Sequence, residues 1–177
     1  MLKKMLFLFI ILAAVPAISY ASLGPFGLSV GTTTISEARA QLSSRTKLEG
    51  AGINKWSNGP MLKSRGTGLG LNGLQEVLLI FNKNNILVGV VLTLNKNRYS
   101  DIKRMLSDQY IIISDEAPFV GNQLATFRKG DLTIEASAPH MSFQMEVNYF
   151  HRTLMEAFNR GSKKEQQEQE RRERSQL

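Results

Sequence analysis

The stretch Leu74–Leu94, LQEVLLIFNKNNILVGVVLTL, constrains the fold more than any other part of this 177-residue chain. Two apolar runs of strand length lie on either side of the polar segment Asn82–Asn85, a pattern typical of a β-hairpin. Asparagine tolerates left-handed backbone angles and bonds to its own backbone, so it suits a tight turn. The segment predicts a central hairpin whose second strand is covered by helix on one face and partly covered on the other.

A buried helix is the competing interpretation of such apolar runs. Gly89, the β-branched residues and the Asn-rich break favour strands instead. Because side chains alternate along a strand, the second strand should present two sets of side chains on opposite faces: Ile86, Val88, Val90, Leu92 and Leu94 on one, and Leu87, Gly89, Val91 and Thr93 on the other.

Residues 1–21, MLKKMLFLFIILAAVPAISYA, have the form of a secretory signal peptide. Lys3 and Lys4 provide the basic start, and Met5–Val15 is an apolar core too short to span a bilayer comfortably. A retained membrane anchor is the alternative. No later stretch is long and apolar enough to span a membrane. The pattern predicts a mature protein that begins near Ser22, lacks a transmembrane anchor, and resides in the periplasm or leaves the cell.

Composition narrows the classes of function. The absence of cysteine excludes thiol catalysis, cysteine-based metal sites and lipid anchoring through an N-terminal Cys. The formal charge of +7 becomes +5 once Lys3 and Lys4 are removed with the signal peptide. A basic exported protein can meet an envelope protein or an anionic envelope component, such as lipid head groups; simple solubility is the alternative. Nucleic acid is not expected as a partner outside the cytoplasm.

Before the hairpin, periodicity predicts one helix and two strands. Thr34 and Glu37 fit a capping box at the start of a helix over residues 36–44. Ser57–Gly73 is rich in glycine and is predicted to be the least structured region, and loops of this length are often functional or disordered. Alternating residues indicate short strands at Phe26–Val30, which would lie at a sheet edge, and at Lys47–Trp56.

After the hairpin, Ser100 is predicted to cap a second helix with Asp101 in its first turn. A closing helix should begin at Phe150, with Gly161 as its C-cap or a kink. Residues 161–177 form a charged tail, either a helical extension or disordered. Strands are predicted at residues 110–113 (buried), 124–128, 132–137 and 143–149, the last with Phe143, Met145, Val147 and Tyr149 on its buried face.

This order predicts one α+β domain over residues 22–160, with an antiparallel sheet and helices on one face in two layers. Helix starts near Ser36 and Ser100 suggest a tandem duplication of a helix-plus-three-strand unit. Gly31 before a capped helix containing Glu37, and the later hairpin, resemble the exported modules of the SmpA-type subunit of the outer-membrane barrel-assembly machine and of β-lactamase inhibitor protein. The resemblance implies a protein-binding role in the envelope and transfers no functional residue.

Three residues are candidates for a binding site. Lys63 and Arg65 in the Gly-rich segment could hold an anion together with backbone N–H groups; a solvated loop is the alternative. His140 lies in the distinctive string PHMSF and could orient Ser142. No helical ligand pair supports a metal site, and Gly68–Gly73, although formally GxGxxG, precedes a strand and so does not predict a nucleotide cofactor.

The sequence therefore predicts a non-enzymatic binding or interaction protein of the bacterial cell envelope, without cofactor or metal. The alternative is a hydrolase acting on an envelope polymer, centred on His140 and nearby carboxylates. An enzyme should gather His140, a carboxylate and a hydroxyl in one pocket, whereas a binding protein should present an exposed apolar or basic patch.

Overall fold

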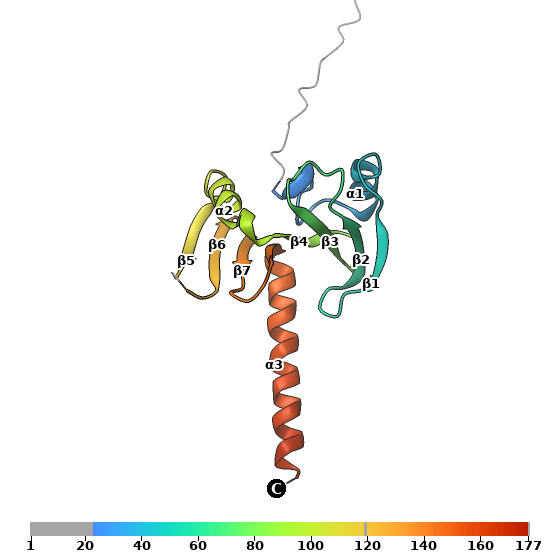
Figure 1. Ribbon diagram of the computed structural model, residues 1–177. Helices are drawn as coiled ribbons and strands as arrows, with labels where there is room; N and C mark the ends of the chain where they lie inside the picture. Colours follow the sequence, from blue (N-terminus) through green and yellow to red (C-terminus); the bar gives the residue numbers. More distant parts are fainter. Residues whose placement is uncertain (1–22, 119, 177) are drawn as a thin grey trace, which may run out of the picture.

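Eight antiparallel strands form one open sheet in the order β1-β2-β3-β4-β8-β7-β6-β5 (Figure 1). The computed structural model describes residues 23–118 and 120–176, so the predicted signal peptide lies outside the described residues. The strands are β1 (Glu49–Ile53), β2 (Asn58–Arg65), β3 (Leu74–Asn82), β4 (Leu87–Asn95), β5 (Ile111–Glu116), β6 (Gln123–Lys129), β7 (Leu132–Ala138) and β8 (Gln144–His151). The helices are α1 (Ile35–Leu42), α2 (Tyr99–Ser107) and α3 (Arg152–Arg174), with short 3-10 turns η1 (Pro25–Gly27) and η2 (Lys96–Arg98).

The chain is built as two similar halves. Helix α1 is followed by β1–β4 and α2 by β5–β8, and the last strands of the two halves pair at the centre, where Leu92 lies opposite Val147. The predicted unit of three strands was one strand short. The reason is that β2 forms within the segment Ser57–Gly73, which was expected to be least structured. Leu62 of β2 is buried, and the strand pairs with β1 and β3. This long-range pairing overrides the local effect of the glycines.

The larger core joins side chains of the sheet to side chains of the first two helices. Ala38 and Leu42 of α1 and Ile102 and Leu106 of α2 pack in one cluster with buried side chains of β3, β4 and β6–β8. In Figure 1, α1 and α2 lie above the strands. The predicted antiparallel sheet and mixed α+β composition are confirmed.

Helix α3 belongs to a second, smaller core. Leu154 packs with Ile80 and Val88, and α3 extends below the strands in Figure 1. The predicted C-cap or kink at Gly161 was wrong, since the helix continues to Arg174. The reason is tertiary: a Cβ at Gly161 would lie 2.2 Å from the ring of Trp56, so only glycine lets the indole approach the helix.

The same contact region ties α3 to the β1–β2 turn. The ring of Phe158 meets that of Trp56 edge to face, with centroids 5.3 Å apart. Lys55 pairs with Glu165 at 2.5 Å. Within the predicted charged tail, residues 161–174 are part of helix α3. No helix within residues 23–118 and 120–176 combines the length and the apolar character that crossing a membrane requires.

The predicted central hairpin is confirmed as β3 and β4, but one detail of its alternation was wrong. The register shifts at a bulge, where Ile80 lies opposite Gly89 and Phe81 opposite Leu87. A bulge leaves one residue without a partner and so reverses the alternation. Leu87 therefore joins the larger core together with Val90, whereas Val88 faces the smaller core.

Three apolar segments also differ from prediction. Phe26 belongs to η1 rather than to an edge strand, although Leu28 and Val30 after it are buried. The predicted buried strand is the edge strand β5, which pairs with β6 on one side and ends the described sheet on the other. Its residues Ile111, Ile112 and Ile113 are exposed. Phe143 precedes β8 and is 93% exposed.

The predicted capping box of α1 is confirmed and makes stability depend on pH. The Glu37 carboxylate accepts a hydrogen bond from the Thr34 backbone N–H at 2.7 Å. This bond, followed by the one from the Thr34 hydroxyl, holds the pKa of Glu37 below its ordinary value of 4.5. A lowered folded-state pKa means that the ionised form stabilises the fold above the unfolded value, and that this contribution is lost as pH falls through the folded pKa.

We therefore expect Glu37→Gln to be less stable than the wild type at pH 7 and to approach it below pH 4.5. Glutamine can still accept the Thr34 N–H, so the comparison isolates the charge. Thermal unfolding of both proteins between pH 7 and pH 3 checks this. A stability difference that stays constant over the whole range would contradict it.

Candidate functional site

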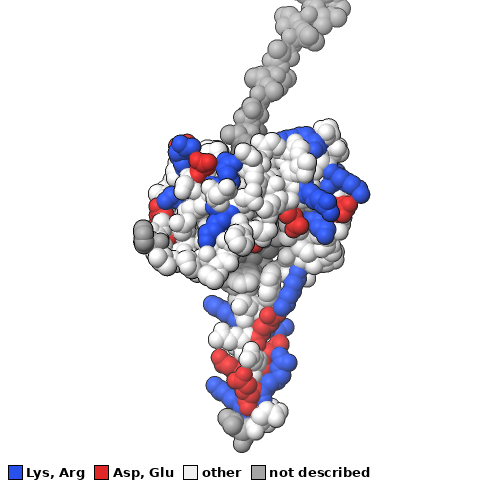
Figure 2. All heavy atoms as spheres, viewed as in Figure 1, with Lys and Arg blue, Asp and Glu red and all other residues white. Residues whose placement is uncertain are grey.

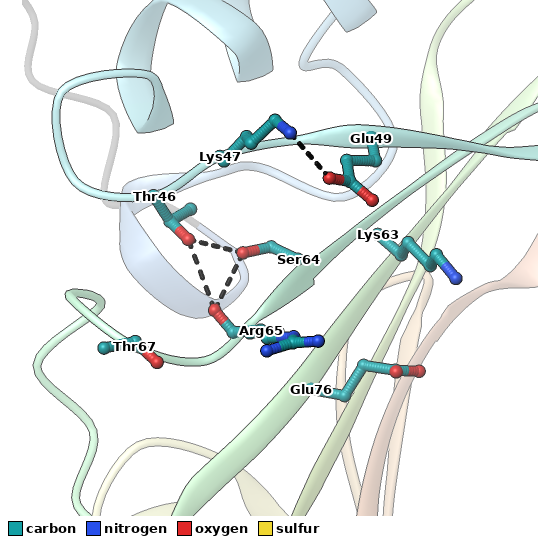
Figure 3. A pocket seen from close by; sticks show the side chains of 8 residues that line it. All are labelled: Thr46, Lys47, Glu49, Lys63, Ser64, Arg65, Thr67 and Glu76. Carbon is teal, nitrogen blue, oxygen red and sulfur yellow. Dashed lines mark hydrogen bonds and ion pairs between the residues drawn. The ribbon is translucent and has the colours of Figure 1, made fainter.

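A polar pocket of about 610 Å³ lies where β1 diverges from β2 (Figure 3). The last paired residues at this end are Glu49 of β1 and Lys63 of β2. Beyond them the chain from α1 approaches β2 through side chains rather than through a backbone ladder. We call this the β1–β2 pocket; it is lined by Thr46, Lys47, Glu49, Lys63, Ser64, Arg65, Thr67 and Glu76.

Strand geometry brings the two predicted cations together. Lys63 and Arg65 are two residues apart on β2, so their side chains leave the same face of the sheet. Their cross-strand partners on β3 are Leu78 and Glu76. Figure 3 shows both cations on the same side of the strand as Glu76. Both residues were expected within the least structured, Gly-rich segment; that placement was wrong, since they are part of the paired strand β2.

A hydrogen-bonded cluster closes the opposite side of the pocket. Ser64 is 4% exposed, and its hydroxyl donates to the Arg65 carbonyl at 2.8 Å. The Thr46 hydroxyl lies 2.5 Å from that of Ser64. A buried hydroxyl needs such partners to offset its desolvation. The cluster joins the segment after α1 to β2 and thereby defines the wall of the pocket.

The electrostatics of the pocket leave two cations without an ionic partner. Lys47 pairs with Glu49 at 2.9 Å, and the hydrogen bond and charge of Lys47 lower the pKa of Glu49, with smaller contributions from Lys63 and Arg65. Among the described residues, neither Lys63 nor Arg65 has a carboxylate oxygen within 4.0 Å. The pocket can therefore offer an ammonium and a planar guanidinium to an anion.

His140 lies apart from this pocket. It is exposed in the connection between β7 and β8, and β3, β4 and β8 separate β7 from β2 in the sheet. Its backbone N–H donates to Asn122 at 2.8 Å, and its carbonyl accepts from Lys96 at 2.9 Å. The hydroxyl of Ser142 accepts from the backbone of Gln144 instead of pairing with His140.

The predicted hydrolase would need a carboxylate and a hydroxyl close to His140. The carboxylate of Asp115, one of the acids in the second half, pairs with Lys103 of α2 at 2.9 Å rather than approaching His140. Over residues 23–118 and 120–176, no three His, Cys, Asp or Glu side chains are grouped in a way that could hold a metal ion. Of the three candidate residues, Lys63 and Arg65 therefore lie in the same pocket, and His140 lies outside it.

Several pocket residues were not identified from the sequence. Thr46, Lys47 and Glu49 precede the predicted loop, and Glu76 follows it. Alternation along Lys63 and Arg65 was the one local signal that could have placed both on a strand face. The contribution of Glu76 depends on the β2–β3 register, which residues distant in sequence determine.

Comparisons with known proteins do not assign the chain to a family. No protein-family model, no curated protein and no solved structure matches this chain.

Proposed function

We propose that this is an exported, non-enzymatic binding protein of the bacterial cell envelope that holds an anionic envelope component at the β1–β2 pocket. The observation that carries the proposal is the pair Lys63 and Arg65, adjacent on one strand face and free of carboxylate partners in the described structure. The N-terminal signal-peptide pattern supports an envelope location.

The proposal also takes the domain to have two layers, with α1 and α2 on one face of the sheet. The opposite face is then partly open on both sides of α3. Lys63 and Arg65 belong to this face, because they alternate with Leu62, which is part of the larger core. In Figure 2, Lys and Arg side chains gather on the β1–β2 side of the part of the molecule that contains the sheet, with Asp or Glu beside them.

The chemistry of the pair favours an anion with several oxygen atoms. Guanidinium presents paired N–H donors that match a carboxylate or a phosphate, and ammonium adds a compact charge beside it. Hydroxyls of the pocket, such as that of Thr67, can add neutral hydrogen bonds. Glu49 is already neutralised by Lys47, so it opposes such an anion less than its charge suggests.

The test is sedimentation of the exported, purified protein with isolated Gram-negative cell envelopes. We expect saturable binding that weakens with salt. The double variant Lys63→Gln/Arg65→Gln should bind at least about tenfold more weakly, because hydrogen bonds to charged groups contribute about 1.5–3 kcal/mol each.

The matched control is Lys83→Gln/Arg128→Gln, which removes the same two charges from exposed positions outside the pocket. It should bind as the wild type does. Equal binding by the pocket variant would contradict the proposal. Release of soluble fragments from the envelopes, abolished by His140→Ala, would instead establish the hydrolase alternative.

A further inference from the structure

A second pocket, of about 370 Å³, lies over the central strands between the two halves of the chain. Its lining includes Leu92 of β4 and Val147 and Tyr149 of β8. Helix α2 and the turn η1 contribute further lining residues, and Figure 1 shows η1, in blue, between α1 and α2. We call this the central pocket. It is separate from the β1–β2 pocket and independent of the function proposed for it.

Most of the central pocket is apolar. Leu92 and Val147 are almost fully buried members of the larger core, and Ile102 and Leu106 of α2 line the pocket beside them. Phe26 and Leu71 are partly buried against the same core. An apolar group that enters this space loses contact with water on several sides, which is the usual basis of small-molecule binding.

Two tyrosine hydroxyls provide polar groups in this apolar setting. Tyr149 is 6% exposed and Tyr110 is 9% exposed, and their rings meet edge to face with centroids 6.3 Å apart. Within the described residues, neither hydroxyl has a hydrogen-bond partner, and neither is sealed from solvent as the unbonded hydroxyl of Tyr99 is. Burial raises the pKa of Tyr110 and of Tyr149, so both remain protonated donors.

One cation accompanies these donors. Arg45, in the segment after α1, is exposed, and its Nη2 donates to the Leu69 carbonyl at 2.6 Å. Arg45 is the single charged side chain in the described lining of the central pocket. No carboxylate oxygen of the described residues lies within 4.0 Å of its side-chain nitrogens. The pocket thus combines apolar walls, two free hydroxyl donors and one uncompensated positive charge.

We propose that the central pocket binds a small amphiphilic monoanion, an aliphatic or aryl carboxylate. The apolar part contacts Leu92, Val147 and the α2 wall. The carboxylate accepts hydrogen bonds from the tyrosine hydroxyls and faces the guanidinium of Arg45. The volume is near the lower end for ligand pockets, about 300–1,000 Å³, and therefore suits one small molecule rather than a folded partner.

The experiment is calorimetric titration of the exported, purified protein with decanoate, below the concentration at which decanoate forms micelles. We expect saturable binding of one decanoate per chain. Decanol should bind at least about tenfold more weakly, because it lacks the charge that Arg45 recognises. In methyl NMR spectra, the signal of Met105, which lines the pocket, should shift on binding, while that of the exposed Met141 should not.

Three variants and one control make the result specific. Tyr110→Phe and Tyr149→Phe remove hydroxyls that bond to no other described residue, so each should fold normally and weaken decanoate binding several-fold. Arg45→Gln should weaken it about tenfold. Lys63→Gln removes an equal charge from the β1–β2 pocket and should leave decanoate binding unchanged.

The inference is overturned if decanoate shows no saturable binding. Binding that persists unchanged in Tyr149→Phe and Arg45→Gln would overturn it as well, as would equal affinity for decanol and decanoate. Because Arg45 also holds the Leu69 carbonyl, its variant is interpreted together with the two tyrosine variants. Envelope binding through Lys63 and Arg65 is measured separately, so either proposal can fail without the other.

Discussion

Gly59→Ala is expected to lower the free energy of unfolding by about 3 kcal/mol, the upper part of the usual range for overpacking. A Cβ at Gly59 would lie 2.2 Å from the Phe81 carbonyl oxygen and 2.3 Å from the Asn82 carbonyl carbon. Both are backbone atoms of β3, so neither can move aside as a flexible side chain would. Strand β2 would have to separate from β3 near its start. The decrease in the free energy of unfolding can be measured by urea unfolding, with the fluorescence of Trp56 as the signal.

The control is Gly50→Ala on the edge strand β1. No heavy atom lies within 4 Å of the position that its Cβ would take. Alanine there should leave stability unchanged or raise it by about 0.4–1 kcal/mol, because it restricts the unfolded chain. If Gly59→Ala and Gly50→Ala behaved alike, the close approach of β2 to β3 would be refuted. Since β2 carries Lys63 and Arg65, we also expect Gly59→Ala to weaken envelope binding.

Phe127→Ala should cost about 3–5 kcal/mol, the usual loss when a fully buried phenylalanine is truncated. Phe127 of β6 is 0% exposed and lies in the larger core. Its removal takes away apolar burial and leaves a cavity that the sheet cannot fully close. The midpoint of urea unfolding should fall, with little change in its slope, because the surface exposed on unfolding stays similar.

Phe143 provides a matched comparison, because the residue type is the same and only the environment differs. It is 93% exposed, so Phe143→Ala should change stability by no more than about 0.5 kcal/mol. A large loss there would show that Phe143 is buried, as its alternation with Met145 had predicted. The pair therefore tests the place at which β8 begins.

The candidate site was predictable in part. The sequence shows that Lys63 and Arg65 are cationic and can bind an anion. It does not show that both lie on a β-strand. Thr46, Glu49 and Glu76 join them only through the pairing of β1 and β3 with β2. Arg45, Tyr110 and Tyr149 are likewise distant in sequence and meet because β8 returns to pair with β4.

The sequence by itself determined the features that depend on near neighbours. The Asn-rich turn between β3 and β4 and the capping box of Thr34 and Glu37 both formed as predicted. In each, the residues that specify the geometry lie within a few positions of one another, so a local pattern carries the information.

Only the tertiary structure decided the features that depend on a distant partner. Strand β2 forms because β1 and β3 satisfy its backbone, and the bulge opposite Phe81 sends Val88 to the smaller core. Gly161 lies within the helix, and the ring of Trp56 occupies the space that a side chain there would take. Ile111–Ile113 remain exposed because β5 is the last strand of the sheet. Burial is a property of what packs against a residue, and no local pattern contains that.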